Sequence, residues 1–209
     1  MAHNVAAVIR LMLVTDDKLL RGRDLVQLAQ DAEQGGVTAL QVRLKERPAR
    51  QLVELVTKLV ATLNIPVLVN DRPDVALAAG AAGAHLGPED LPVALARRIA
   101  PPGFILGASV GSEAETAAAG AADYWGIGPW RGTSTKKDAG QALDAVGFRD
   151  IVRLSGQRPC IAIGGVFPED VASVFASGGS GVAVASGILG ADDIAAAARR
   201  YSGAMRGLF

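Results

Sequence analysis

The chain has 209 residues, 21 of them basic and 21 acidic, so its formal net charge at pH 7 is zero. This balance argues against a nucleic-acid-binding protein of the usual basic kind. Half of the residues are hydrophobic and only 4% are aromatic, which together with 25 glycines indicates a globular domain packed from small side chains. No stretch approaches the roughly 18 consecutive apolar residues of a membrane span, and Arg10 interrupts the apolar N-terminal run before it takes the form of a signal peptide. These features predict a cytoplasmic protein with no nucleic-acid or membrane partner.

Eight short segments rich in Val, Ile and Leu recur at a fairly regular spacing and are predicted to be strands. In chain order they are Leu11–Val14, Ala39–Val42, Val67–Val69, Ala84–Leu86, Ile105–Ala108, Tyr124–Ile127, Ile161–Ile163 and Gly181–Ala185. Most are followed by an amphipathic helical stretch, and this alternation is typical of a parallel sheet covered by helices. Eight such units in about 200 residues predict one (β/α)8 TIM barrel domain over residues 1–209. A doubly wound open sheet is the alternative, but it usually has fewer strands, and no Gly-x-Gly-x-x-Gly turn follows the first strand.

The second predicted strand runs into Gln41, Arg43 and Lys45, which alternate with Val42 and Leu44. Because successive side chains point to opposite faces of a strand, the three polar groups share one face, and in a barrel they would point inward. Two cations in a barrel mouth are costly to desolvate unless an anion meets them, which indicates a phosphorylated ligand. A solvated strand end is the simpler alternative.

Acidic residues follow the third and fourth predicted strands, at Asn70-Asp71 and at Glu89-Asp90. Carboxylates at the ends of adjacent parallel strands can share Mg²⁺, which typically takes one or two protein carboxylates together with phosphate oxygens and water. Each has a simpler alternative, since Asp90 could cap the following helix and Asp71 could serve the turn before Pro73. Beside the cationic second strand, a site for a metal and a diphosphate is the better interpretation.

The ends of the last four predicted strands carry hydroxyls and small residues. Ser109 follows the fifth strand, although a lone Ser there is more often a cap or turn residue. The long segment from Pro129 to Gln141 has a hydroxyl and lysine cluster that suits phosphate oxygens and a mobile substrate loop, with an exposed polar loop as the alternative. Gly164-Gly165 and Ala185-Ser186 leave backbone N–H groups accessible after strands seven and eight, a frequent phosphate site of such barrels. The sequence therefore predicts a second, monophosphate-like anion site.

A set of short pieces spans nearly the whole chain, from Leu11 to about Tyr201. They are Leu13-Val14-Thr15-Asp16, Gly22-Arg23-Asp24, Gln41-x-Arg43-x-Lys45, Asn70-Asp71, His85-Leu86-Gly87-x-Glu89-Asp90, Gly107-x-Ser109, Gly126-x-Gly128-Pro129, Thr133-x-Thr135-Lys136, Ile163-Gly164-Gly165 and Ala185-Ser186. In this order and spacing they resemble the thiamine-phosphate synthase family. Members of that family are (β/α)8 barrels that join 4-amino-5-hydroxymethyl-2-methylpyrimidine diphosphate to 4-methyl-5-(2-phosphoethyl)thiazole, or its carboxylated form, with release of pyrophosphate.

The resemblance implies a role for each matching residue. Pyrimidine diphosphate would be held by Gln41, Val42, Arg43, Leu44, Lys45, Asn70, Ser109 and Lys136, among which Arg43, Lys45, Ser109 and Lys136 would be catalytic. Thiazole phosphate would be held by Thr133, Ser134, Thr135, Gly165, Ala185 and Ser186, and one Mg²⁺ by Asp71 and Asp90. In such a mechanism the protein supplies position and electrostatics, so neither Cys160, predicted to be a buried structural thiol, nor His3 or His85 need act as a nucleophile or base.

The chain departs from the family pattern in two places. Arg131-Gly132 stands where members usually have an aromatic residue and Pro, and Gly111 stands where a His commonly follows the Ser. A thiazole tautomerase of the closely related barrel family is one alternative function, and a non-catalytic sensor of thiamine precursors is another. A tautomerase would use a histidine after the fifth strand, and a sensor has no use for leaving-group stabilisation, so the residues favour the synthase. Whether the chain forms a homo-oligomer is left open, as is its preference between the plain and the carboxylated thiazole.

Overall fold

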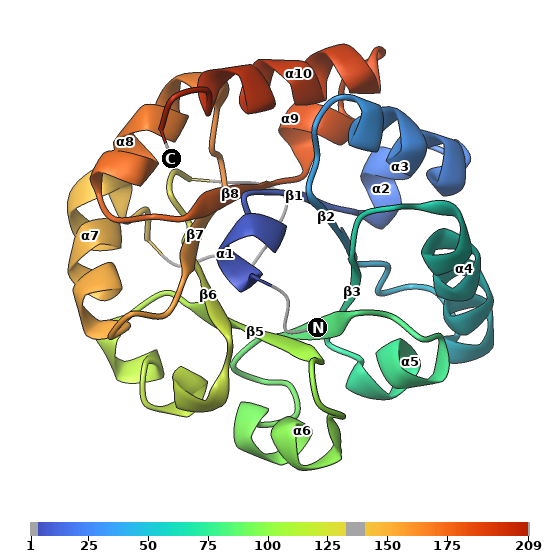
Figure 1. The fold of residues 1–209 in the computed structure, drawn as a ribbon, viewed down its shortest axis with the longest axis horizontal. Coiled ribbons are helices and arrows are strands. Elements are labelled where there is room, and N and C mark those ends of the chain that lie inside the picture. Colours follow the sequence, from blue (N-terminus) through green and yellow to red (C-terminus); the bar gives the residue numbers. More distant parts are fainter. Residues whose placement is uncertain (1–3, 133–140, 209) are drawn as a thin grey trace.

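Eight parallel strands form a closed barrel in the computed structural model, which describes residues 4–132 and 141–208. The strands are β1 (Leu11–Val14), β2 (Ala39–Val42), β3 (Val67–Asn70), β4 (Gly83–Leu86), β5 (Ile105–Val110), β6 (Tyr124–Ile127), β7 (Cys160–Ile163) and β8 (Gly181–Val184). Each strand pairs with its neighbours in sequence, and β1 closes the barrel against β8 (Figure 1). The predicted (β/α)8 barrel is confirmed, and every strand overlaps its predicted segment.

Helices surround the strands as an outer ring (Figure 1). They are α2 (Asp17–Leu20), α3 (Leu25–Gln34), α4 (Ala49–Thr62), α5 (Pro73–Ala78), α6 (Val93–Ile99), α7 (Asp144–Leu154), α8 (Val171–Ala176), α9 (Ser186–Leu189) and α10 (Ile194–Ala204), with α1 (Val5–Val8) before the first strand. Three short 3-10 helices are η1 (Glu113–Glu115), η2 (Ala118–Ala121) and η3 (Pro168–Asp170). The segment between β5 and β6 contains η1 and η2 in place of an α-helix. Within the described part of the chain, no helix is long and apolar enough to cross a membrane.

The core has two layers, one between strands and helices and one inside the barrel. The outer layer contains the apolar faces of the helices, such as Leu52, Val56 and Leu59 of α4. The inner layer gathers one or two side chains from most strands, including Met12 and Tyr124. The barrel is therefore a packed core and not a pore.

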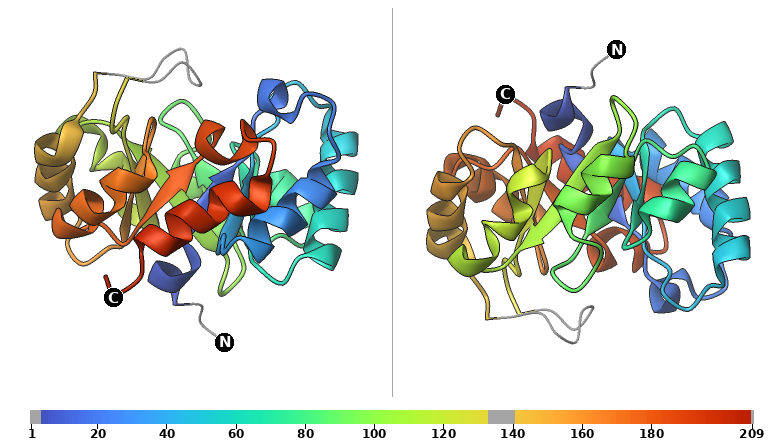
Figure 2. Two further views of the ribbon diagram at one scale, coloured as in Figure 1. Left: turned by 90° about the horizontal axis from the view of Figure 1, so that it is seen from above. Right: turned by 90° about the horizontal axis from the view of Figure 1, so that it is seen from below.

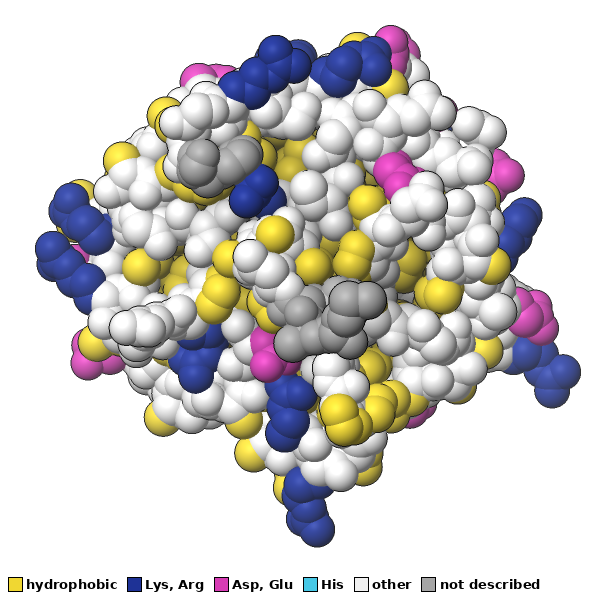
Figure 3. Space-filling model, viewed as in Figure 1, with side chains coloured by type: hydrophobic (Ala, Val, Ile, Leu, Met, Phe, Trp, Pro, Cys, Tyr) yellow, Lys and Arg dark blue, Asp and Glu magenta, His cyan; other side chains and the backbone are white. Residues whose placement is uncertain are grey.

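The helix α1 lies at one end of the barrel, opposite the end at which α2 and α9 lie (Figure 2). Its Val5 and Val8 pack against the inner core layer. On the face that carries α1, hydrophobic side chains are scattered around the centre and most Lys and Arg lie toward the edge (Figure 3). The C-terminal ends of the strands lie at the other end of the barrel, where the candidate site is found.

Candidate active site

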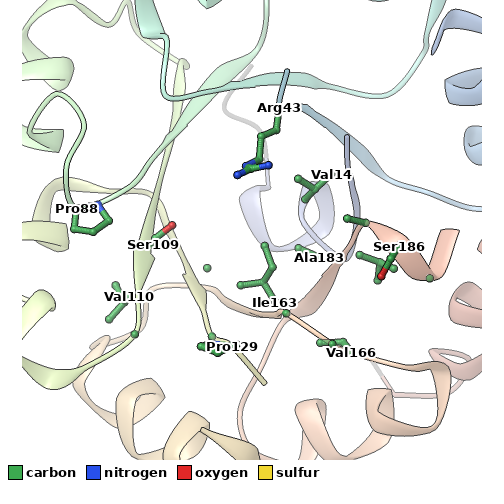
Figure 4. Close-up of a pocket in the computed structure, with 18 of the residues that line it drawn as sticks. Val14, Arg43, Pro88, Ser109, Val110, Pro129, Ile163, Val166, Ala183 and Ser186 are labelled. Atoms are coloured by element: carbon green, nitrogen blue, oxygen red, sulfur yellow. The ribbon is translucent and has the colours of Figure 1, made fainter. Parts of the chain in front are cut away.

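A cavity of about 720 Å³ lies at the C-terminal ends of the strands. Figure 4 shows Arg43 reaching into it from the end of β2, with Ser109 of β5 on one side and Ser186 at the start of α9 on another. Ile163 and Ala183, from β7 and β8, lie between them. The cavity is at the end of the barrel where the strand-end reasoning expected chemistry.

The loop after β1 holds Arg43 in place. Thr15, which is fully buried, accepts a hydrogen bond from the Arg43 backbone N–H at 2.7 Å. The Asp16 carboxylate lies 3.3 Å from Arg43 Nη1, and its other oxygen caps the first turn of α2. Asp17 accepts a 2.8 Å hydrogen bond from the backbone N–H of Lys45. The loop after β1 thus holds the Arg43 side chain by an ion pair and the Lys45 backbone by a hydrogen bond.

Lys45 and the two predicted metal ligands form a charged cluster beside the cavity. Lys45 Nζ lies 3.0 Å from Asp71 Oδ2, and Asp90 Oδ2 accepts a 2.6 Å hydrogen bond from Gly87 N–H. Burial raises the pKa of Asp90 above its ordinary value, and the hydrogen bond with the Asp71 carboxyl and its charge raise it further, against the opposing effects of Gly87 N–H and Lys45. The two carboxyls are therefore neighbours, as the metal hypothesis requires.

The structure excludes the simpler interpretation of Asp90. The helix α6 has no side-chain cap, and its N-cap position is Pro92, so Asp90 does not cap it. Asp71 has φ +64°, in the left-handed region that Asp adopts more readily than most non-glycine residues, and its side chain forms an ion pair with Lys45. Asp71 can therefore serve the turn before Pro73 and still present its carboxylate to Lys45.

Behind the cavity, a chain of polar groups runs through the barrel interior. His85 is 5% exposed, with Nδ1 2.9 Å from the Tyr124 hydroxyl and Nε2 3.0 Å from the Ser109 hydroxyl. Gly107 makes room for this pair, because a Cβ there would lie 2.2 Å from the Tyr124 ring. Ser109 is thus oriented from beneath by His85, which agrees with the structural role predicted for that histidine.

The remaining predicted pyrimidine-site residues occupy different surroundings. Gln41 is 2% exposed and donates to Met12 Sδ at 3.3 Å, so it lies in the barrel interior and does not line the cavity. The side chains of Val42 and Leu44 pack in the outer core, on the face opposite the polar side chains, as the alternation predicts. Asn70 ends β3 and is partly buried. Cys160 is a buried free thiol, as predicted.

The rim at β7 and β8 is built from small residues. Gly165, Ala185 and Ser186, all predicted to bind a phosphate, line the cavity together. The glycines Gly164 and Gly165 have φ values of +86° and +69°, which glycine adopts without strain. Thr133, Ser134, Thr135, Lys136 and His3 lie outside the described residues, as does most of the predicted substrate loop. Its described flanks, Pro129 and Gln141, both line the cavity.

Several lining residues were given no binding role by the sequence interpretation, although Val14, Thr15 and Glu89 belong to the pieces that carry the family resemblance. These lining residues are Val14, Thr15, Pro88, Glu89, Ser112, Glu115, Val166 and Phe167. Thr15 and Asp16 directly follow the first predicted strand, so their position alone indicates a place at the mouth of the barrel. Glu115 carried no such signal, because it lies in η1 and not at a strand end; it lines the cavity and accepts a 2.6 Å hydrogen bond from Gly111 N–H.

Comparison with known proteins identifies the family. Residues 11–188 match the family described as thiamine monophosphate synthase. The chain is 45% identical over 194 residues to thiamine-phosphate synthase of Methanoculleus marisnigri, covering 90% of this chain and 92% of the other. It is also 45% identical over 195 residues to thiamine-phosphate synthase of Moorella thermoacetica, covering 91% and 92%. The chain belongs to the thiamine monophosphate synthase family. It is therefore an enzyme of the transferase class, in thiamine biosynthesis.

Solved structures agree with this family assignment. Thiamine phosphate pyrophosphorylase from Pyrococcus furiosus superposes with a TM-score of 0.86 at 34% identity, over 99% of this chain and 100% of that one. Phosphoribosyl anthranilate isomerase from Thermus thermophilus superposes with a TM-score of 0.67 at 18% identity, over 96% and 100%, and shares only the fold.

Proposed function

We propose that the protein condenses 4-amino-5-hydroxymethyl-2-methylpyrimidine diphosphate with 4-methyl-5-(2-phosphoethyl)thiazole, or its carboxylated form, to give thiamine phosphate and pyrophosphate. The observation that supports this proposal is that one barrel end brings together two different groups of residues, each of which we propose binds an anion. One is ionic, around Arg43, Lys45 and the carboxyls of Asp71 and Asp90, and the other is the small-residue rim of β7 and β8. The names of relatives that are 45% identical over 194 and 195 residues support the synthase over the tautomerase and the sensor.

The donor set at Asp71 and Asp90 fits one Mg²⁺. Both supply carboxylate oxygens, the ligands that this hard cation prefers. Burial and then the neighbouring Asp71 carboxyl raise the pKa of Asp90, and a shared cation would relieve the repulsion between the two carboxylates. Among residues 4–132 and 141–208, no group of three or more His, Cys, Asp or Glu is arranged to hold a metal. A site with two protein carboxylates leaves room for diphosphate oxygens and water. When bound there, Mg²⁺ would neutralise charge on the departing pyrophosphate.

In this reaction the protein would supply the relative position of the two substrates and electrostatic stabilisation of the leaving pyrophosphate. The bond between the pyrimidine methylene carbon and the diphosphate oxygen breaks, its electron pair leaves with pyrophosphate, and the thiazole nitrogen forms the new C–N bond. Electron donation from the pyrimidine amino group favours this dissociative displacement. Arg43, Lys45 and Lys136 would stabilise the leaving group, and Ser109, aligned by His85, would hold the pyrimidine diphosphate.

The thiazole substrate would bind at the other side of the cavity. Backbone N–H groups at Gly165, Ala185 and Ser186 would take its phosphate, with Thr133, Ser134 and Thr135 contributing from the segment after β6. This arrangement would place the thiazole nitrogen toward the ionic site. We propose that the enzyme acts on these small phosphorylated molecules in the cytoplasm.

The experiment is pyrophosphate release from purified protein mixed with both substrates and Mg²⁺, with each component omitted in turn. We expect release that requires all three and an equal amount of thiamine phosphate. Binding of the thiazole phosphate without any release would contradict the synthase and favour the sensor, and isomerisation of the carboxylated thiazole phosphate would favour the tautomerase.

A further inference from the structure

Arg131 ties the end of β6 to the turn that follows β7. Its backbone N–H donates to Gly164 O at 2.9 Å, which continues the ladder between the two strands. Its guanidinium forms an ion pair with Asp170 and lies 5.3 Å from the centre of the Phe167 ring. The same Nη1 lies 3.5 Å from Gly165 O. One side chain thus contacts the turn at three points.

The Asp170 partner is buried, so the ion pair matters to the turn. The Asp170 side chain is only 8% exposed, whereas that of Arg131 is 45% exposed. The Asp170 oxygen that meets Arg131 also accepts a 2.8 Å hydrogen bond from Phe167 N–H. A buried carboxylate that loses its cation becomes costly, and its surroundings rearrange to reach water or another donor. Loss of Arg131 is therefore expected to release the turn.

The turn held by Arg131 forms part of the cavity wall. Gly165, Val166 and Phe167 all line the cavity. Arg131 packs closely against the turn, because a Cβ added at Gly165 would lie 2.9 Å from Arg131 Cβ. The position of Arg131 and the position of the Gly165 backbone are consequently coupled.

We propose that Arg131 is a positioning residue for the phosphate of the thiazole substrate. Through Asp170 and Phe167 it fixes the turn whose Gly165 N–H would take that phosphate, without contacting the substrate itself. The proposal rests on the proposed function, because it assumes that this rim is the thiazole-phosphate site. It predicts a selective effect, since the ionic site at β2, β3 and β4 makes none of these contacts.

The test compares steady-state kinetics of the wild-type enzyme with Arg131→Ala, Arg131→Lys, Asp170→Asn and the double variant Arg131→Ala/Asp170→Asn. Asp170→Asn removes the charge and retains an oxygen for Phe167 N–H. Arg153→Ala is the matched control, because Arg153 forms an exposed ion pair with Asp150 on α7, at 3.2 Å. Thermal unfolding of every variant shows that the proteins compared are folded.

We expect Arg131→Ala and Asp170→Asn each to raise the KM for thiazole phosphate about tenfold, because a small displacement of a binding group has a large effect on its ligand. The KM for pyrimidine diphosphate should stay within about twofold, Arg131→Lys should recover part of the loss, and the double variant should be little worse than either single one. Arg153→Ala should change neither KM.

Three results would overturn the proposal: an unchanged KM for thiazole phosphate in both folded single variants, equal rises in the two KM values, or fully additive effects in the double variant. These differ from a failure of the proposed function, in which the wild-type enzyme itself would release no pyrophosphate.

Discussion

The two sides of the barrel mouth are built on different physical principles. At β2, β3 and β4, ionised side chains pair with one another, as Arg43 does with Asp16 and Lys45 with Asp71. At β7 and β8, the wall combines apolar side chains with glycines, Ala185 and Ser186, and these small residues bring backbone close to the cavity. At β2–β4, the charged side chains can leave their ion pairs and bind a ligand instead. At β7 and β8, the backbone N–H groups are already held in position by the fold.

This difference suits the two ligands of the proposed reaction. A diphosphate that departs gains negative charge during the reaction, so groups that stabilise it belong to the transition state. A phosphate that only anchors its substrate keeps its charge throughout, and backbone N–H groups bind it equally before and after the chemical step. Changes at β2–β4 should therefore lower kcat, whereas changes at β7–β8 should raise one KM.

The largest effect is expected from Asp71→Asn and Asp90→Asn. Each should lower Mg²⁺-dependent pyrophosphate release by at least about a hundredfold, because one carboxylate is lost from the predicted metal site. Asn retains an acceptor for Gly87 N–H at position 90, so the fold should be kept. Asp74→Asn is the control, since Asp74 pairs with Arg72 on the exposed surface of α5. Near-normal release in either site variant, with Mg²⁺ still required, would show that the metal assignment is wrong.

A smaller effect, about 10- to 100-fold on kcat, is expected from Arg43→Ala, because the leaving pyrophosphate would lose one cation. Asp16→Asn should cost less, because Arg43 keeps its charge and its backbone bond to Thr15. Stopped assays at saturating concentrations of both substrates measure this. An Arg43→Ala enzyme with normal kcat and a raised KM for thiazole phosphate would reverse the assignment of the two sides.

The barrel could be predicted from the sequence because its strands are continuous apolar segments. Such segments can be recognised from the local sequence, without knowledge of tertiary contacts. The sequence also predicted that five strand-end residues lie together, since the ends of parallel strands meet at one end of the barrel. In the structure all five line one cavity, namely Arg43, Ser109, Gly165, Ala185 and Ser186. Strand-end position alone decides this part of the site.

Contacts between distant segments could not be predicted in the same way. The ion pair of Arg131 with Asp170 joins residues 39 positions apart, and no local sequence pattern predicts it. Gln41 shares the inward face of β2 with Arg43, yet it lies deeper in the barrel interior. Its side chain contacts Met12 and does not line the cavity. Depth within a barrel is set by strand tilt and register, which a period-two alternation does not contain.

At the β7 side, Gly165→Ala should raise the KM for thiazole phosphate about tenfold with little change in kcat. Two causes combine, namely a φ of +69° and a Cβ that would lie 2.9 Å from Arg131 Cβ. Gly103→Ala is the control, because it has a φ of +83° and open space around its Cβ. Gly103→Ala should lose about 1–2 kcal/mol of unfolding free energy and Gly165→Ala at least as much, and only Gly165→Ala should change KM. Equal kinetics in the two would remove Gly165 from the phosphate site.

The smallest effect is expected from Tyr201→Phe, which removes the second anchor of the β7 turn. The Tyr201 hydroxyl donates to Val166 O at 3.0 Å, and its loss should cost about 1 kcal/mol of unfolding free energy at pH 7. Burial raises the pKa of Tyr201 to about 12, above the value of about 10 in an unfolded chain. Because the folded state favours the neutral phenol, this stabilisation is complete below about pH 10 and is lost as the pH rises toward 12. Urea unfolding at pH 8 and pH 11 should therefore show a smaller alkaline loss of stability in Tyr201→Phe than in the wild-type protein, and equal losses would show that the folded state leaves the ionisation of Tyr201 unchanged.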